Sequence, residues 1–166
     1  MRLAKLLILL NTLPWLLFGC SNYDVKLNER VVYDAQQRFG DYSLSDAALS
    51  NCVEETIKSN NIRQVRQLRI LDCSDAGIAS LAGLEAFTHL EQIDLRNNKL
   101  SQASELAELE YISVILIAGN DLESAAFLQD LPALQQADLN NNPKLLCESL
   151  PAALVTKLTL PGHCEL

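Results

Sequence analysis

The sequence has few of the residues that most catalytic and metal sites need. Only two histidines occur, His89 and His163, and no CxxC or Cys/His spacing typical of a metal site is present. The 166 residues contain no glycine-rich phosphate loop and no recognisable nucleophile with a positioned base. Both histidines are expected to be solvated rather than catalytic. These gaps disfavour an enzyme, a metalloprotein and a cofactor-binding protein.

Positive charge is also scarce. The chain has 13 Lys and Arg against 21 Asp and Glu, and removing Arg2 and Lys5 with the leader described below leaves 11 − 21 = −10. Such a surface repels phosphates. The nearest candidate for a basic patch is Arg63, Arg66 and Arg69, whose wide spacing is more typical of a solvated face. Nucleic acid is therefore not an expected partner.

Long apolar runs are missing as well, apart from a short one near the start. Residues 1–19 place two cations before an apolar run from Leu6 to Phe18, and Asn11 and Pro14 interrupt that run. Charge followed by a short apolar stretch is the pattern of a secretory signal, and the stretch is too short and broken for a membrane span. We therefore predict a signal peptide at 1–19.

The signal ends in Leu17-Phe18-Gly19-Cys20, which resembles the lipobox of bacterial lipoproteins. The resemblance implies that Cys20 becomes the mature N-terminus and carries diacylglycerol and usually a third acyl chain, each buried CH₂ adding about 0.8 kcal/mol of membrane affinity. In lipoproteins of bacteria with two membranes, the residue after the lipidated cysteine biases sorting. By this resemblance Ser21, unlike an aspartate, implies that the protein is sorted to the outer membrane. The alternative is an unmodified cysteine after a chance apolar run. We expect a lipid-anchored envelope protein with an anchor and tether at 20–42, part of which docks on the domain that follows.

Beyond residue 67 the sequence repeats with a period of 22 residues. The four copies are LRILDCSDAGIASLAGLEAFTH (68–89), LEQIDLRNNKLSQASELAELEY (90–111), ISVILIAGNDLESAAFLQDLPA (112–133) and LQQADLNNNPKLLCESLPAALV (134–155). Aligned as columns, they give column four as Leu71, Ile93, Ile115 and Ala137, column six as Cys73, Leu95, Ile117 and Leu139, and column nine as Ala76, Asn98, Asn120 and Asn142. The regular columns predict one structural unit per copy.

The copies resemble the leucine-rich repeats of bacterial internalin-type proteins, with the pattern LxxLxLxxNxL over residues 68–143. The resemblance implies an α/β fold, a short solenoid of about four repeats. Columns three to seven are expected to form a parallel strand with columns four and six in the core. Asn in column nine is expected to pair with buried backbone groups of neighbouring turns. Ala76 interrupts this ladder, so water or the preceding cap would have to satisfy the backbone of the first turn.

A solenoid needs a cap at each end, because its outermost repeats would otherwise expose their core. Residues 43–61 predict a helix with an apolar face, within an N-terminal cap at 43–67. At the other end, VTKLTL at 155–160 predicts a closing strand within a C-terminal cap at 144–166. Its apolar positions, one residue early, are Val155, Leu158 and Leu160.

Five cysteines become four once Cys20 is assigned to the lipid. Four cysteines permit three connectivities. Cys52 on the cap helix and Cys73 in column six of the first repeat are expected to be neighbours, and Cys147 and Cys164 flank the closing strand. We therefore predict the pairs 52–73 and 147–164, one at each end of the solenoid.

Columns three, five and seven are expected to face outward on the concave side of the sheet. They hold candidate partner-binding residues, namely Ile70, Asp72, Asp94, Arg96, Val114, Leu116, Ala118 and Asp138. In the third repeat these columns are all apolar, as Val114, Leu116 and Ala118, where the neighbouring copies have Gln, Asp, Arg or Asn. Adjacent exposed apolar groups flanked by charge suit a partner-binding centre. Drift without a partner, or cover by residues 21–42, explains the same pattern.

These features predict a lipid-anchored envelope protein that binds a protein or peptide partner through its repeats. Two alternatives remain open. One is a structural lipoprotein without a dedicated ligand, and the other is a calcium-dependent adhesin or sensor that uses the aspartates of column five.

Overall fold

In a computed structural model of the chain, the structure describes residues 25–27, 30–33 and 42–164. The chain divides into two compact units, 1–38 and 39–166, which are described separately. The predicted signal peptide, Cys20 and Ser21 lie outside the described residues. Within the described residues, no helix has the length and apolar character needed to cross a membrane.

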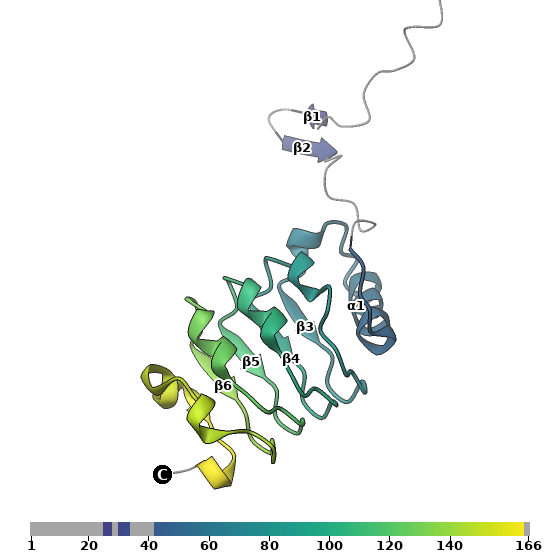
Figure 1. The fold of residues 1–166 in the computed structure, drawn as a ribbon. Coiled ribbons are helices and arrows are strands. Elements are labelled where there is room, and N and C mark those ends of the chain that lie inside the picture. Colours follow the sequence, from purple (N-terminus) through teal and green to yellow (C-terminus); the bar gives the residue numbers. More distant parts are fainter. Residues whose placement is uncertain (1–24, 28–29, 34–41, 165–166) are drawn as a thin grey trace, which may run out of the picture. The chain divides into compact units, whose positions relative to one another are not determined.

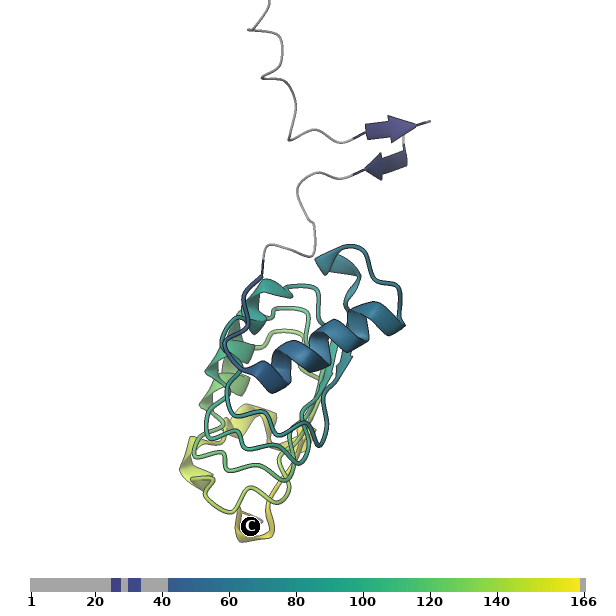
Figure 2. The same cartoon turned by 90° about the vertical axis from the view of Figure 1, so that its right-hand side faces the viewer.

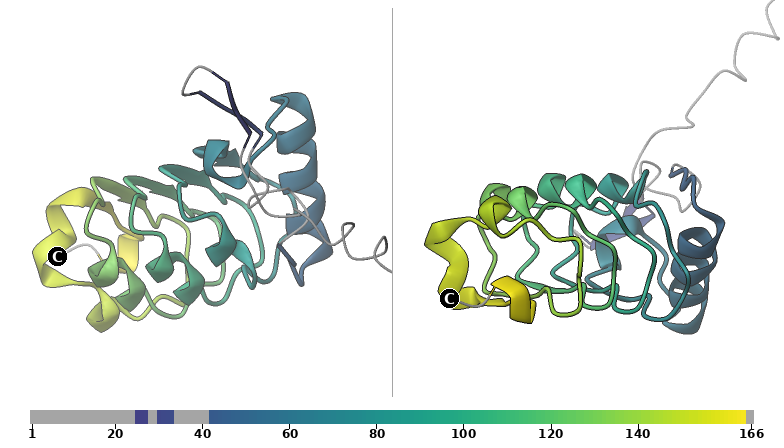
Figure 3. Two further views of the ribbon diagram at one scale, coloured as in Figure 1. Left: turned by 90° about the horizontal axis from the view of Figure 1, so that it is seen from above. Right: turned by 60° about the horizontal axis from the view of Figure 1, so that its bottom comes forward.

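The second unit is a stack of repeating turns, each with a short strand on one side and a 3₁₀ turn on the other (Figures 1 and 3). Five parallel strands form one sheet in chain order. They are β3 (Ile70–Asp72), β4 (Gln92–Asp94), β5 (Val114–Leu116), β6 (Gln136–Asp138) and β7 (Leu158–Thr159). The 3₁₀ turns after the first three are η3 (Leu84–Ala86), η4 (Ser104–Glu108) and η5 (Ala126–Asp130).

The strand register confirms the 22-residue period. Ile70 pairs with Gln92, Gln92 with Val114, and Val114 with Gln136, a step of 22 residues each time. The last step is shorter by one, because Leu158 pairs with Ala137, as the early closing strand predicts. Each regular strand has three residues rather than the five expected, although hydrogen bonds between turns continue past it, as from Cys73 N–H to Asp94 C=O.

The core lies between the sheet and the 3₁₀ turns. Column four is at most 1% exposed in every repeat, and column six at most 2%. The leucines of the 3₁₀ turns, Leu84, Leu106 and Leu128, are fully buried from the opposite side. A repeat of this size can bury these side chains only against its neighbours, so the stack is stable as a whole rather than turn by turn.

A ladder of buried asparagines joins successive turns. Asn120 is 4% exposed; its Oδ1 accepts from Leu100 N–H, and its Nδ2 donates to the carbonyls of Leu95 and Ile117. Asn98 and Asn142 make the equivalent bonds one turn earlier and one turn later. Each asparagine therefore satisfies backbone groups of its own turn and of the turn before it.

This direction corrects the expectation that Ala76 leaves the first turn unsatisfied. Asn98 reaches back to bind Ile78 N–H and Cys73 C=O, so the first turn receives its bonds from the second. An asparagine at position 76 would have to reach back to a preceding turn, and that place is occupied by the helical cap. Ala76 instead packs against the core.

The residue before the ladder position has a left-handed backbone in every repeat. Asp75, Asn97 and Asn141 have φ of 55°, 56° and 53°, and Gly119 has φ of 70°. Asp, Asn and Gly are the residues that adopt this conformation at least cost. At Gly119 a side chain would also collide with its neighbour, because an added Cβ would lie 2.4 Å from the Asn97 Oδ1.

Helix α1 (Ala47–Ser59) crosses the open face of the first repeat (Figure 2). It buries Leu49 and Val53 against the solenoid, as its predicted apolar face requires. Asp46 is its N-cap: Oδ1 accepts from Ala48 and Leu49 N–H, while Oδ2 accepts from Ala79 and Ser80 N–H in the first repeat. A single carboxylate thus caps the helix and ties it to the solenoid.

Both caps contain the predicted disulfides. Cys52 on α1 is bonded to Cys73 in the core of the first repeat, and Cys147 is bonded to Cys164 across the closing strand. The C-terminal cap differs from the prediction at Val155, which is 38% exposed. It lies in the 3₁₀ turn η7 (Ala152–Lys157), so only Leu158 and Leu160 turn toward the core.

Preceding the solenoid, β1 (Val25–Leu27) and β2 (Arg30–Tyr33) form an antiparallel hairpin in the first unit. Part of the predicted tether was expected to dock on the solenoid, and Tyr42 at its end packs against Phe87 of the first repeat, with ring centroids 4.9 Å apart. The side chains of Tyr23, Tyr33 and Phe39 lie outside the described residues.

We predict that Asp46→Asn lowers the free energy of unfolding by about 1–2 kcal/mol, because the amide keeps the cap but loses the carboxylate that accepts from the repeat. Asp46→Ala loses both and should cost about 2–3 kcal/mol. Glu55→Gln, on the exposed side of α1, is the matched control and should change stability by less than about 0.5 kcal/mol. Urea unfolding measures all three.

The pH dependence of the Asp46 variants provides a second test. Although partial burial opposes charge on Asp46, four backbone N–H groups hold its pKa below the usual value. A lowered folded pKa contributes stability above the unfolded value, near pH 4, and loses it as the pH falls through the folded pKa. The stability difference between the wild type and Asp46→Asn should therefore shrink in acid. A difference that is constant from pH 7 to acid would contradict this role.

Candidate functional site

The parallel sheet brings the predicted partner-binding residues to one solvent-facing surface, which we call the strand face. Its rows run across the strands, because residues in the same column are register partners. Column three places Ile70 and Val114 in a row with two glutamines, and column five places Asp72, Asp94, Leu116 and Asp138 in a second row. Leu116 lies directly between Asp94 and Asp138.

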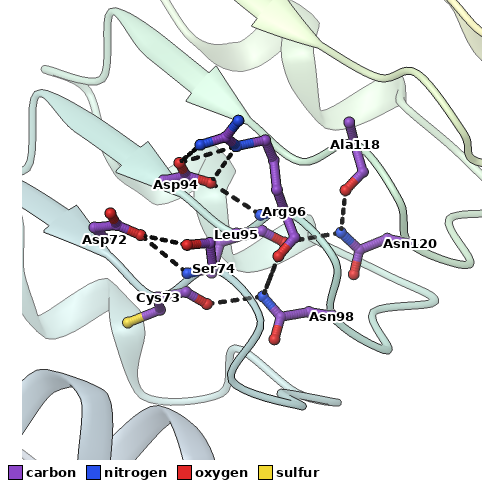
Figure 4. Close-up of polar contacts among 9 residues, drawn as sticks. All are labelled: Asp72, Cys73, Ser74, Asp94, Leu95, Arg96, Asn98, Ala118 and Asn120. Carbon is purple, nitrogen blue, oxygen red and sulfur yellow. Dashed lines mark hydrogen bonds and ion pairs between the residues drawn. The ribbon is translucent and has the colours of Figure 1, made fainter.

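Three of the four residues in column five are aspartates, and each accepts a hydrogen bond from the backbone N–H two residues further along the chain. The Asp72 Oδ1 accepts from Ser74 N–H at 3.1 Å, and the Asp94 Oδ1 accepts from Arg96 N–H at 3.0 Å (Figure 4). Asp138 repeats the bond with Asn140 N–H. Each carboxylate satisfies the chain as it leaves the strand, in the local geometry that aspartate favours in turns. Leu116 is the member of the row that cannot do so.

Arg96 neutralises one of these aspartates. Its Nε lies 3.0 Å from both Asp94 carboxylate oxygens and its Nη2 lies 2.5 Å from Oδ2, so the guanidinium covers the carboxylate (Figure 4). Partial burial alone would raise the Asp94 pKa, but the hydrogen bonds and charge of Arg96 hold it below the usual value. In turn Asp94, with smaller contributions from Asp72 and Asp138, raises the Arg96 pKa. Asp72 and Asp94 are register partners on adjacent strands, and Arg96 relieves the repulsion between their carboxylates.

The apolar residues of the third repeat are less exposed than predicted. Val114 and Leu116 are half-buried on the strand face, whereas Ala118 is only 9% exposed and corrects the expectation that it faces solvent. Ile70 is 61% exposed at the N-terminal edge of the sheet. The apolar surface therefore consists of Val114 and Leu116 in the centre and Ile70 at one edge.

A hollow beside Ile70 was not anticipated from the sequence. Its walls come from β3 and from the end of α1 with the loop that follows; they include Thr56, Asn60, Ile62, Arg69, Ile70 and Asp72. Arg69 is held there by an ion pair with Glu91. No sequence signal marks the hollow, because it arises from the angle at which the cap meets the sheet.

A second hollow lies on the opposite side of the solenoid, between η4 and η5. Ala103, Ala107, Ala126 and Phe127 line it together with serine and acidic side chains. None of the predicted partner-binding residues contributes to it.

The histidines and cysteines do not form an open metal site. Within the described residues, the one group of three potential metal ligands is Cys147, His163 and Cys164, and its two sulfurs are joined in a disulfide. His163 binds Leu145 C=O through Nε2, and His89 stacks on Tyr111 with ring centroids 5.7 Å apart. His163 is exposed and His89 is half-buried, in line with the expectation that both are solvated, and each also makes a local contact.

Comparison with known proteins agrees with this geometry. Residues 66–108 match the family model for Leucine Rich repeats (2 copies). The fold is a leucine-rich repeat solenoid. Its solved relatives include the internalin InlF of Listeria monocytogenes, with 24% identity over 57% of this chain and 30% of that one and a TM-score of 0.53. Internalin C2 of the same organism has 18% identity over 70% of this chain and 53% of that one, with a TM-score of 0.57.

These likenesses concern the fold, and the matched regions span about a third to a half of the two internalin chains. A search of curated protein sequences finds no match to this chain. A shared fold does not by itself assign a function. Any binding surface of this solenoid must be argued from its own residues.

We predict that Leu116→Asp leaves the fold intact, because aspartate occupies this column in the other three repeats and can bind the chain two residues on. The control is Ile115→Asp on the same strand. Ile115 is fully buried, and an unpaired carboxylate there should unfold the domain. Circular dichroism and urea unfolding measure both variants. A Leu116→Asp variant that unfolds like Ile115→Asp would contradict the assignment of the two faces.

Proposed function

We propose that the protein is a lipid-anchored envelope protein whose solenoid binds a peptide or loop of a partner protein on the strand face. The observation that carries this is Leu116 in column five. Every other repeat has an aspartate there that accepts a backbone N–H, so the third repeat replaces a structural bond with a half-exposed apolar side chain. Loss of a useful bond in favour of exposed apolar surface is typical of a binding centre.

The size of the strand face sets the kind of partner. Five strands at about 4.8 Å spacing give a surface about 20 Å across. A standard protein interface covers about 800 Å² on each partner, which is more than this surface offers alone. A peptide, a loop or the edge of a helix therefore fits better than a large globular partner.

Site-specific photo-crosslinking tests the location of the binding surface. A photoreactive residue at position 116 should capture a defined partner in the cell, identified by mass spectrometry, and the same residue at exposed Gln129 on η5 should not. With the crosslinker moved to position 92, on the neighbouring strand, Leu116→Asp should abolish capture of that partner. Capture from position 129 but not from 116 would place the binding surface on the opposite side and reject the proposal.

The lipid anchor is the second part of the proposal and rests on the lipobox-like Leu17-Phe18-Gly19-Cys20. Several acyl chains on Cys20 would hold the protein stably on a membrane. Cys20→Ser should move the protein from the membrane fraction to the soluble fraction and remove the lipid mass from its N-terminal peptide. Capture of the partner from position 116 should persist where that partner is accessible. An unmodified Cys20 in the membrane-associated wild type would contradict lipid anchoring.

A further inference from the structure

The strand face is apolar at its centre and negative at two of its flanks. Asp94 is matched by Arg96, but no ion pair joins Asp72 or Asp138 to another described residue. With three aspartates and one arginine in columns five and seven, its formal charge is −3 + 1 = −2. The two unmatched carboxylates lie on opposite sides of Leu116.

Two other cations near the sheet are already engaged. Arg69 pairs with Glu91, and Lys157 donates its Nζ to Leu134 C=O at 2.6 Å. Asp72 is exposed and Asp138 is half-buried, so both can be reached from solvent. Each also has one oxygen, Oδ2, with no hydrogen bond to the described residues. The two carboxylates can therefore each accept a bond from a bound partner.

We propose that the partner is an extended cationic segment with one large apolar side chain seated on Val114 and Leu116 and a Lys or Arg on each side of it. This rests on the proposed function and gives the chemistry of the partner. The apolar side chain covers the exposed patch, while the two cations pair with Asp72 and Asp138. Complementary charge gives such a contact its specificity, because an acidic segment would meet two carboxylates without a counter-charge.

The register of the strands sets the spacing of the cations. Asp138 lies one strand spacing from Leu116, about 5 Å, and Asp72 lies two spacings away on the other side, about 10 Å. An extended chain crossing the strands advances about 3.3 Å per residue. Because alternate side chains of an extended segment face the same way, the segment places one cation about two residues from its apolar residue. The other lies about four residues away on the opposite side, and its long side chain reaches back to Asp72.

The charge of Arg96 should oppose the binding of a cationic segment. It covers Asp94, which lies between Asp72 and Leu116 in the same row. Removing the guanidinium would expose a third carboxylate and remove the positive charge of the strand face. A cationic segment should then bind more tightly, although the substitution removes a charged side chain from the strand face.

The experiment uses the purified full chain and three short synthetic peptides, labelled for fluorescence anisotropy. Each peptide has one Trp in a serine background, and the positions two residues after and four residues before it, which share its face in an extended chain, are Lys, Gln or Glu. We expect the Lys peptide to bind most tightly and the Glu peptide most weakly. Raising the salt from about 0.1 M to 1 M should reduce the difference, because the screening length falls from about 10 Å to 3 Å.

Variants then assign the charges. Asp72→Asn and Asp138→Asn should each weaken binding of the Lys peptide by about two- to fivefold, the range of a solvent-exposed ion pair. Arg96→Gln should strengthen it by a similar factor. The matched control is Glu108→Gln on η4, which removes one exposed carboxylate from the opposite side and should have little effect. Unfolding curves confirm that each variant is folded.

The outcomes separate this proposal from the proposed function. Equal binding of the Lys, Gln and Glu peptides, lost in Leu116→Ser, would keep the strand face as the binding surface and overturn the cationic partner. Weaker binding of the Lys peptide to Arg96→Gln would also overturn it. If no peptide binds while position 116 still captures a partner in the cell, the proposed spacing and chemistry are wrong. Failure of capture at position 116 would instead reject the proposed function.

Discussion

The asparagine ladder is the constraint on which the rest of the solenoid depends. Each rung places one amide where it must meet an N–H and a carbonyl of the preceding turn, together with a carbonyl of its own turn. Removing a rung would leave those backbone groups unpaired in the core, at about 1–3 kcal/mol for each group. A turn of another length would move the amide away from its partners. The ladder therefore holds the period at 22 residues from Asn98 to Asn142 and thereby fixes which side chains reach the strand face.

The ladder also explains why the two ends need different solutions. Because each asparagine reaches backward, the first turn is served by Asn98 and only its outer side needs a cover, which α1 supplies with Asp46 and the 52–73 disulfide. At the other end no further asparagine follows Asn142 within the described residues. There the chain shortens its step by one residue, pairs β7 with β6, and closes with the 147–164 disulfide.

The third repeat folds like its neighbours but differs from them in the side chains on its strand face. Its core and ladder residues match those of its neighbours, and its turn uses Gly119 where they use Asn or Asp. Only its outward columns change, from polar to apolar. The charges on the neighbouring strands follow the same row. Arg96 forms an ion pair with Asp94, whereas Asp72 and Asp138, which lie on opposite sides of Leu116, form none with the described residues. The strand face is thus a small apolar centre with negative flanks, displayed by a protein that we propose is held on a membrane.

Much of the fold could be predicted from the sequence, because columns that recur every 22 residues report burial directly. The core columns follow from the 22-residue spacing, whereas the cap helix, the closing strand and the choice among three disulfide connectivities also needed the resemblance to leucine-rich repeats. Contacts that depend on three-dimensional packing could not be predicted from the sequence. Examples are the backward reach of Asn98, the burial of Ala118, the exposure of Val155 and the hollow beside Ile70. The left-handed column at Asp75, Asn97, Gly119 and Asn141 was visible in the sequence, since only Asp, Asn and Gly occur there.

The central claim is that the strand face around Leu116 is the surface on which a partner is bound. Chemical-shift mapping of the isotope-labelled chain, titrated with the segment of the partner captured in the cell, tests it most directly. The account predicts that the perturbed amides cluster in residues 92–96, 114–118 and 136–140, while η4 and η5 stay unchanged. Perturbations centred on η4 and η5, with β4, β5 and β6 unaffected, would contradict it.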